Sequence, residues 1–404
     1  MRRKIRTLLF STLYPSSARP GHGIFVETRL RELLRTGEVE TRVLAPVPWF
    51  PSTDARWGDF ARMAATPVRE TRNGIDALHP RYLVVPKVGM SVAPLLLAAA
   101  SIGPMRKLIS DGFDFDVIDA HYFYPDGVAA ALLARMVRKP LTITARGSDL
   151  NLISRYMLPR RMMQWAARHA DASIGVSPAL VDVLRNWNID SARLHMMRNG
   201  VDLHRFRPMQ RAEARAELGL KEGPLLLCVG GLLELKGQHL VIDALAAISA
   251  VYPQVRLAIV GHGPEHLRLE QRANARGVRD RVIFAGAVPN ETLAQWYGAA
   301  DMLVLASSRE GWANVLLEAM ACGTPVVATR VGANAEVVTD GVGMLIDERS
   351  PAAIYRAVLQ LLDKPALANS IRARAEQFGW EATSRSQVDL FNRLVDRSSA
   401  SSHA

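Results

Sequence analysis

The segment from Ser307 to Thr329 (SSREGWANVLLEAMACGTPVVAT) has the residue types and spacing of an anion-binding turn. A strand is expected to end near Ala306, and a helix is expected to begin at Ala313 or Asn314. The first turn of a helix has backbone N–H groups without helical partners, and such groups bind phosphate. The turn predicted to hold a diphosphate comprises Gly311, Trp312, Ala313, Asn314 and Val315.

Two glutamates flank this turn. Glu310 lies in the loop before the helix, and Glu318 lies one turn after Asn314, beside the same helix terminus. Carboxylates in these places can accept hydrogen bonds from sugar hydroxyls. Either glutamate alone would suit an ordinary surface helix, whereas the spaced combination indicates a site for a sugar joined to a diphosphate.

The same segment resembles glycosyltransferase family 4, whose members have the GT-B fold. The family pattern is a Glu, seven residues, then Glu-Ala-Met-Ala-x-Gly-x-Pro-Val-Val, and the chain matches it from Glu310 to Val327. Two further stretches, Asn199–Asp202 and Val260–Glu265, extend the resemblance over nearly the whole chain. The resemblance implies that Glu318 holds the ribose of a nucleotide sugar and that Glu310 contacts the donor sugar or phosphate. It also implies that the backbone at Gly286 and Val288 holds the base.

A strand-to-helix turn follows Val229 and carries a possible phosphate contact. The family usually places an Arg after the first Gly of this turn and a Lys five residues later. The chain has Lys236 at the Lys position but Gly231 at the Arg position. A cation at Lys236 would stabilise a departing nucleoside diphosphate, and Gly231 leaves this phosphate clamp with one cation fewer.

Gly21 and Gly23 follow the first expected strand and open a helix. Glycines permit close backbone approach to a phosphate or sugar, and a plain turn explains the pair equally well. By resemblance, Gly23 belongs to a loop that faces the donor.

A His and an Arg are expected at the ends of two neighbouring strands of the first half. His121 keeps the second His of a family Asp-Val-Ile-His-Ala-His pattern, while Asp119 replaces the first. The resemblance implies that His121 orients the donor sugar. Arg146 replaces the His of a family Thr-x-His-Gly-x-Asp turn and could pair with a phosphate or carboxylate of donor or acceptor. Asp149 is assigned either to the acceptor or to the cap of the following helix.

Strand-like apolar runs alternate with helical patterns throughout, which predicts an α/β protein with parallel sheets. We expect GT-B architecture, with two doubly wound (Rossmann-like) domains that face each other across a cleft. The expected domains are 1–203 for the acceptor and 204–380 for the donor, and 381–404 form a helix returning to the first domain with a flexible tail. The expected strands are Ile5–Leu13, Glu40–Pro46, Val117–Ala120, Leu141–Ala145, Ala172–Val176, Leu225–Val229, Arg256–Val260, Val282–Ala285, Met302–Ala306, Pro325–Ala328 and Gly343–Leu345.

The net charge of +11 is confined to the first half of the chain. Residues 1–200 carry 28 Lys and Arg against 17 Asp and Glu, whereas residues 201–404 carry 22 of each. This asymmetry indicates that an anionic partner faces the first half only, or that the basic surface is merely solvated. Together with the basic stretch Arg155–Arg168 and the apolar stretch Val92–Met105, it favours an anionic membrane surface over nucleic acid.

The sequence also bears on whether the protein has a membrane span, disulfides or a metal site. No apolar run approaches the roughly 20 residues of a membrane span, because Pro94 and Pro104 interrupt the longest one. Two cysteines are too few for a disulfide framework and favour a reducing compartment. Asp114-Phe115-Asp116 resembles a metal-binding Asp-x-Asp motif but precedes a core strand, so no metal site and no cofactor are predicted.

These observations predict a retaining glycosyltransferase that uses a nucleoside diphosphate sugar, with a UDP-sugar as donor. The expected acceptor is a glycan or polyprenyl-linked glycan of cell-envelope polysaccharide synthesis. The expected location is the cytoplasm, at the cytoplasmic face of the inner membrane. Two alternatives remain open at this point: a nucleotide-sugar 2-epimerase of the same fold, and an inactive membrane-associated scaffold, which the Gly231 exchange motivates.

Overall fold

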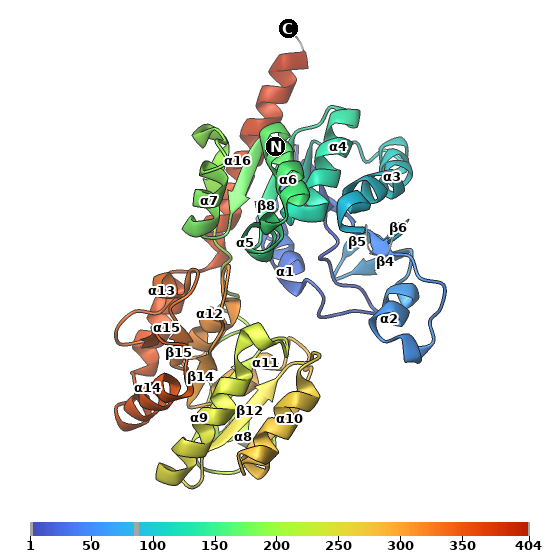
Figure 1. Ribbon diagram of the computed structural model, residues 1–404. Coiled ribbons are helices and arrows are strands. Elements are labelled where there is room, and N and C mark those ends of the chain that lie inside the picture. The colour runs from blue at the N-terminus through green and yellow to red at the C-terminus, as the bar shows by residue number, and fades with distance from the viewer. Residues whose placement is uncertain (1–2, 85–88, 403–404) are drawn as a thin grey trace. The chain divides into compact units, whose positions relative to one another are not determined.

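The computed structural model describes residues 3–84 and 89–402, and the chain forms two compact α/β units (Figure 1). Unit 1 consists of Met1–Arg198 and Glu381–Ala404, and unit 2 consists of Asn199–Trp380. The C-terminal helix α16 (Trp380–Ser402) returns the chain to unit 1. A flexible tail was predicted within 381–404; α16 extends to Ser402, and residues 403–404 lie outside the described residues.

Unit 1 is built on an eight-stranded sheet with the order β10-β9-β8-β7-β1-β2-β5-β4. The pairs from β10 to β5 are parallel, and β4 pairs antiparallel with β5 at the edge. The strand order reverses beside β1, and ligands of such sheets bind outside the carboxyl ends of the strands at this point. The strands are β1 (Ile5–Phe10), β2 (Val39–Leu44), β4 (Arg69–Arg72), β5 (Ile75–Leu78), β7 (Val117–His121), β8 (Leu141–Ala145), β9 (Ala172–Gly175) and β10 (Leu194–Met196), with a separate pair β3 (Val47–Pro48) and β6 (Arg81–Tyr82).

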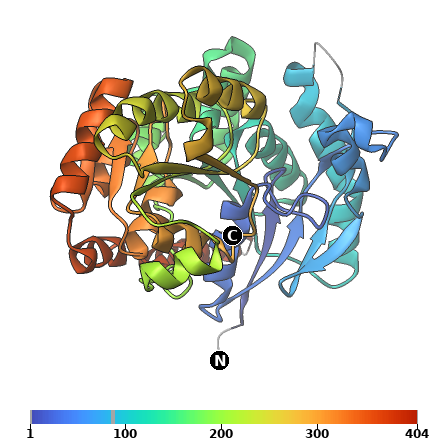
Figure 2. The ribbon, with the colours of Figure 1, turned by 90° about the horizontal axis from the view of Figure 1, so that it is seen from below.

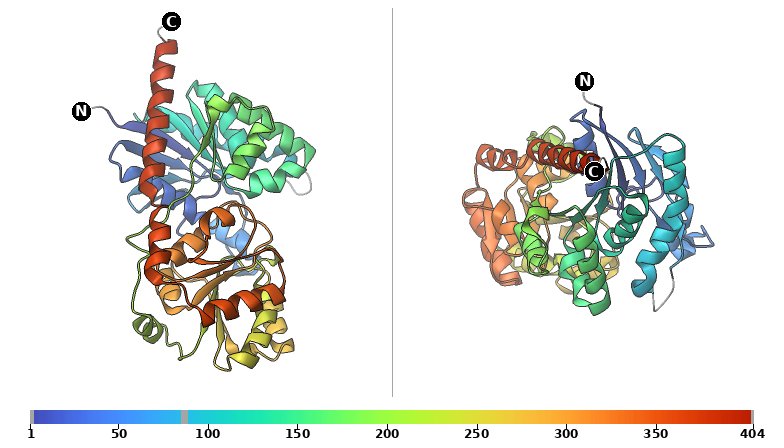
Figure 3. Two further views of the ribbon diagram at one scale, coloured as in Figure 1. Left: turned by 90° about the vertical axis from the view of Figure 1, so that its left-hand side faces the viewer. Right: turned by 90° about the horizontal axis from the view of Figure 1, so that it is seen from above.

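Helices cover both faces of this sheet. Val26, Leu30 and Leu33 of α1 share a buried cluster with β1, β2 and residues Val388 and Phe391 of α16, and Figure 3 shows α16 along this face. Helices α3, α4 and α6 pack against one another on the opposite face. The helices of unit 1 are α1 (Ile24–Leu34), α2 (Asp59–Ala65), α3 (Gly89–Ser110), α4 (Val128–Val137), α5 (Ser148–Asn151), α6 (Met157–His169) and α7 (Pro178–Arg185).

Unit 2 is built on a parallel six-stranded sheet with the order β13-β12-β11-β14-β15-β16. Its strand order reverses between β11 and β14. Figure 2 shows α9 and α10 on one side of this sheet and α8 on the other. The strands are β11 (Leu225–Val229), β12 (Arg256–Val260), β13 (Val282–Gly286), β14 (Met302–Leu305), β15 (Val326–Thr329) and β16 (Gly343–Ile346), and the helices are α8 (Arg211–Glu217), α9 (Gln238–Val251), α10 (His266–Ala275), α11 (Leu293–Ala299), α12 (Asn314–Ala321), α13 (Asn334–Val337), α14 (Pro351–Asp363) and α15 (Ala368–Glu376).

Each strand expected from the sequence is present, with ends that differ by a few residues. Pro94 and Pro104 were expected to interrupt the apolar stretch Val92–Met105, and this expectation was wrong. Helix α3 runs unbroken through Pro94 and Pro104, and its length and composition would suit a membrane span, with 28% of its most apolar window buried. A proline removes one backbone N–H donor, and packing against neighbouring helices can retain the helix around it. Because α3 packs on α4, it is also a covering helix of the unit 1 sheet.

Candidate functional site

The loops after β11 and β14 bring Lys236 and Glu310 into direct contact. Lys236 ends a short 3-10 turn (Glu234–Lys236) after β11, and Glu310 lies in the loop after β14. Because β11 and β14 are paired, their following loops lie side by side at the carboxyl edge of the sheet. Lys236 Nζ lies 2.6 Å from Glu310 Oε1, and the Glu310 side chain is only 9% exposed. The sequence therefore predicted both residues, and the structure joins them as an ion pair.

Glycines allow the turns around this pair to touch. Gly237 has φ of +76°, and a Cβ there would lie 2.1 Å from the carbonyl oxygen of Ala306. A Cβ at Gly332 would lie 2.2 Å from the carbonyl oxygen of Glu310. Any side chain at either position would push the turns apart, so these glycines fix the place of Lys236 and Glu310.

Helix α12 begins at Asn314, as the sequence predicted, and brings Glu318 beside its first turn. Glu318 Oε2 accepts a 2.7 Å hydrogen bond from the hydroxyl of Tyr297. Burial raises the pKa of Glu318, while the Tyr297 hydroxyl and the charge of Arg205 act in the opposite direction. Glu318 is thus held in one orientation by a hydroxyl donor at Oε2.

The remaining predicted residues of unit 2 lie on the same edge of the sheet. Trp312 is 7% exposed, and its ring packs against that of Phe378. Gly231 is exposed, and Gly286 ends β13 with φ of +69°. Val288 follows in the next loop and is partly buried; Gly311, Ala313, Asn314 and Val315 lie at or before the start of α12.

In unit 1, His121 lies at the end of β7 and is 1% exposed. Its Nε2 lies 3.2 Å from Asp119 Oδ2, and its Nδ1 contacts a guanidinium nitrogen of Arg146. A carboxylate only accepts hydrogen bonds, so Nε2 carries the proton and Nδ1 accepts from Arg146. Burial lowers the pKa of His121 to about 4, with the Arg146 charge adding to this effect and Asp119 opposing it. His121 is therefore neutral at neutral pH.

Asp149 organises the two turns beside His121. Its carboxylate accepts hydrogen bonds from the backbone N–H groups of Phe123, Arg146 and Gly147 at 2.8 to 3.2 Å. This side chain is fully buried. These bonds fix the turns before α5 (Ser148–Asn151), whereas the helix cap predicted for Asp149 was wrong, because Asp149 lies inside that helix.

Gly23 starts α1 with φ of +66°, and a Cβ there would lie 2.4 Å from the carbonyl carbon and oxygen of Leu13. The glycine loop is therefore packed closely onto the segment after β1. Next to it, Thr12 donates backbone and hydroxyl hydrogen bonds to the buried carboxyl of Asp126. Burial raises the pKa of Asp126 to about 7.

Several residues of these clusters carried no sequence signal. Tyr297 binds Glu318, and Gln387 donates to Asp119. Each comes from an element far along the chain from its partner, so local spacing could not reveal it. Asp126 follows His121 closely, but a single Asp after a proline has no distinguishing pattern.

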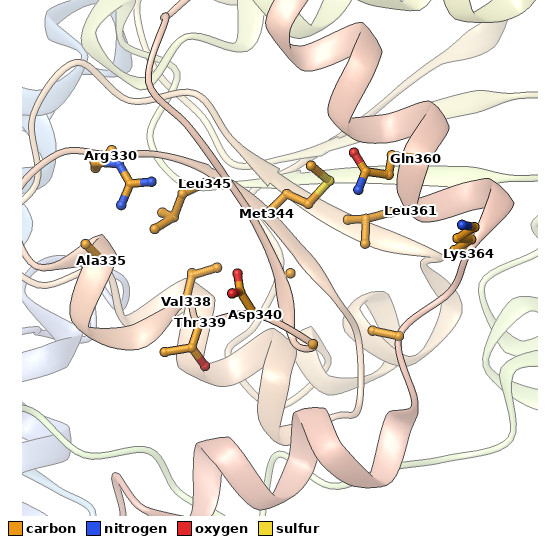
Figure 4. Close-up of a pocket in the computed structure, with 13 residues that line it drawn as sticks. Arg330, Ala335, Val338, Thr339, Asp340, Met344, Leu345, Gln360, Leu361 and Lys364 are labelled. Carbon is orange, nitrogen blue, oxygen red and sulfur yellow. The ribbon is translucent and has the colours of Figure 1, made fainter.

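A cavity of about 630 Å³ lies beside β16, the edge strand of the unit 2 sheet (Figure 4). It is bounded by β16, the turn between α13 and β16, and the end of α14. Its labelled side chains include Met344 and Leu345 of β16 and Lys364 beyond α14. None of the predicted site residues lines it. Among residues 3–84 and 89–402, no group of three or more His, Cys, Asp or Glu side chains could hold a metal ion. Asp114 pairs with Lys139, and Asp116 accepts from the backbone N–H of Arg6.

Comparison with known proteins follows the division into two halves. A family model described as "Glycosyltransferase Family 4" matches residues 21–205, and one described as "Glycosyl transferases group 1" matches residues 210–378. A D-inositol 3-phosphate glycosyltransferase of Xylanimonas cellulosilytica is 31% identical, over 83% of this chain and 85% of its own. A Bacillus subtilis (strain 168) protein named for glycosyltransferase activity in teichuronic acid biosynthesis, TuaC, is 29% identical over 88% of each chain.

Solved structures share the same architecture. The chain aligns with Anabaena Alr3699/HepE, whose crystal contains UDP and glucose, with a TM-score of 0.72 and 20% identity. The alignment covers 96% of this chain and all of the other. At this identity the likeness establishes the fold alone.

Proposed function

We propose, because this chain belongs to glycosyltransferase family 4 and has the GT-B fold, that it transfers a sugar from a nucleoside diphosphate sugar to a cell-envelope glycan or lipid-linked acceptor. The observation that carries the proposal is the convergence in unit 2 of Lys236, Glu310 and the first turn of α12. A UDP-sugar is the proposed donor, since the structural relative Alr3699/HepE was crystallised with UDP and glucose.

The donor roles follow from the chemistry of each group. The ribose hydroxyls would bond to Glu318, and the base would lie against the backbone at Gly286 and Val288. The diphosphate would meet the amides at the start of α12 and the ammonium group of Lys236, which stabilise the charge of the leaving nucleoside diphosphate. With Lys236 drawn to the diphosphate, the Glu310 carboxylate would accept a hydrogen bond from a hydroxyl of the donor sugar. With these cationic and amide groups, the proposed reaction requires no metal ion or other cofactor.

Unit 1 is proposed to hold the acceptor, and the family resemblance implies donor-directed roles for its glycine loop and His121. Both ring nitrogens of His121 are bonded, Nε2 to Asp119 and Nδ1 to Arg146, so His121 would act on the donor sugar through Arg146. The guanidinium of Arg146 would meet an anionic group of donor or acceptor. Retention of anomeric configuration is proposed from the family resemblance.

A panel of nucleoside diphosphate sugars tests this function directly. We expect one UDP-sugar to raise the melting temperature, and transfer to begin only when a glycan or lipid-linked acceptor is added. The anomeric proton signals of donor and product would show retention. Epimerised sugar nucleotide without acceptor would replace the proposal by the epimerase alternative, and absence of any nucleotide binding would favour the scaffold.

We also propose that unit 1 associates with an anionic membrane surface. The start of α6 exposes Tyr156, Met157 and Leu158, with Met157 at 69%, and the exposed Arg155, Arg160 and Arg161 flank them. Apolar side chains between arginines suit the interface of an anionic bilayer. Nucleic acid is not proposed as a partner. With nucleotide sugars as substrates and two buried free cysteines, the proposed location is the cytoplasmic face of the inner membrane.

Vesicle binding tests this surface. Met157→Glu with Leu158→Glu should weaken binding to vesicles rich in phosphatidylglycerol, and added salt should weaken binding of the unaltered protein. Leu367→Glu is the matched control, because Leu367 is 74% exposed in unit 2. Equal binding to neutral and anionic vesicles would contradict the proposal.

A further inference from the structure

We propose that Asp119 is a positioning residue that fixes the tautomer of His121 and, through His121, the place of the Arg146 guanidinium. This inference rests on the proposed function and assigns a role to two residues that depart from the family pattern. Asp119 and Arg146 each stand where the family often has a His. The structure connects both exchanges through one side chain, because Asp119 and Arg146 bind opposite nitrogens of His121.

The hydrogen bonds around His121 admit one protonation state. Asp119 Oδ2 is an acceptor for the Nε2 proton, and the Arg146 guanidinium is a donor that needs a lone pair on Nδ1. An imidazolium, or the tautomer protonated at Nδ1, would place a proton on Nδ1 against the Arg146 donors. Asp119 and Arg146 therefore select the same neutral tautomer from opposite sides.

Asp119 is itself held from two further elements. Thr142 of β8 donates to Oδ1 at 2.8 Å, and Gln387 of α16 donates to Oδ2 at 2.9 Å. The oxygen of the Gln387 amide accepts from Arg29 Nε at 2.9 Å, which fixes the direction of the amide. Arg29 and Asp119 are both fully buried. The carboxylate thus cannot turn away from His121 without breaking bonds to α16 and β8.

The charges of Arg29 and Arg146 explain why an Asp stands at position 119. Arg29 and Arg146 are close enough to influence each other, and Asp119 is the carboxylate that attracts both. A His at position 119 would leave the two guanidinium groups without this counter-charge. Arg146 is also placed by Phe25 in the first turn of α1, whose ring centroid lies 5.3 Å from the guanidinium carbon. The result is a cation held at the carboxyl end of β8.

The first test measures the tautomer itself and needs no activity. In a ¹⁵N long-range correlation spectrum of the whole protein, we expect His121 to be protonated at Nε2, unprotonated at Nδ1, and unchanged between pH 5 and 9. An imidazolium or an Nδ1-protonated ring at pH 7 would overturn the inference. If the protein transfers no sugar, the proposed function fails, but this spectrum still decides whether His121 has the tautomer that Asp119 and Arg146 would select.

The second test is a double-mutant cycle with kcat/KM for the nucleotide sugar as the readout. Arg146→Leu removes the guanidinium and Asp119→Leu misplaces it, so each should lower kcat/KM about 100-fold. The double variant should be no less active than the less active of the two single variants. Asp119→Asn keeps an acceptor for His121 but removes the counter-charge to Arg29 and Arg146, so its kcat/KM should lie between that of the unaltered protein and that of Asp119→Leu. Losses that add independently, or Asn as damaging as Leu, would overturn the inference.

The family residues provide an independent check. Asp119→His and Arg146→His should each impair transfer, and the combined variant should recover more activity than either single variant. Asp116→Asn on the same segment is the control, because Asp116 contacts Arg3 and Arg6 rather than His121. A combined variant no better than the single ones would contradict a link through His121.

Discussion

Lys236 Nζ lies 2.6 Å from Glu310 Oε1, so the residues that follow β11 and β14 neutralise each other at the carboxyl edge of the unit 2 sheet. The pair holds the lysine in place while no other anion is near. A diphosphate that enters this edge would compete with Glu310 for the ammonium group. Under the proposed function, this contact would keep a cation oriented toward a leaving group whose charge grows during the reaction.

Removing this cation should slow the chemical step more than it weakens binding. Lys236→Ala is expected to lower kcat about 100-fold, because the charge on the leaving diphosphate develops in the transition state. Initial rates at saturating donor measure this effect. Lys221→Ala alters an exposed lysine of the same unit and should leave kcat unchanged. Full turnover of the Lys236 variant would remove it from the phosphate contact.

Glu318 should govern donor affinity. Replacing it by Ala is expected to weaken binding of UDP about 10- to 100-fold, because a carboxylate–hydroxyl bond is a charge-assisted hydrogen bond. Isothermal titration with UDP measures the change. Tyr297→Phe should have a smaller effect in the same direction, since it removes the hydroxyl that orients Glu318. Glu348→Ala, on an exposed loop, is the matched control; unchanged affinity in the Glu318 variant would refute the ribose role.

The glycine at the family Arg position should accept an arginine. A Cβ at Gly231 would have Leu233 Cδ1 as its nearest neighbour, at 3.7 Å, and the residue is exposed. Gly231→Arg is therefore expected to leave the melting temperature unchanged and to tighten UDP binding by adding a cation beside the Lys236 turn.

Gly230 provides the contrast, because its φ is +139° and side chains rarely adopt this conformation. Gly230→Ala should lower the free energy of unfolding by about 1–3 kcal/mol, whereas Gly231→Ala should not. Equal destabilisation by both alanines in urea denaturation would show that Gly231 is also required by the fold.

The sequence predicted what depends on local pattern. The strands of both sheets follow from short apolar runs, and the start of α12 follows from its glycine, its apolar spacing and the Glu310–Glu318 separation. The partners of the site residues could not be predicted. Lys236 and Glu310 are 74 positions apart, and Gln387 reaches Asp119 across 268 positions. Such contacts depend on which strands lie next to each other, and on a final helix that returns to the first unit.

Asp126 should make the stability of the protein fall as the pH rises. Burial raises its pKa from 3.8 to about 7 in the folded protein, so between these values the folded state keeps a proton that the unfolded state releases. The free energy of unfolding therefore decreases through this window. Asp126→Asn, which has the shape of the protonated acid, should gain up to about 4 kcal/mol relative to the unaltered protein between pH 4 and 8. Urea denaturation at pH 4, 6 and 8 measures this difference, and Asp111→Asn on the surface is the control. A difference that stays constant with pH would show that Asp126 is ionised in the folded protein throughout this range.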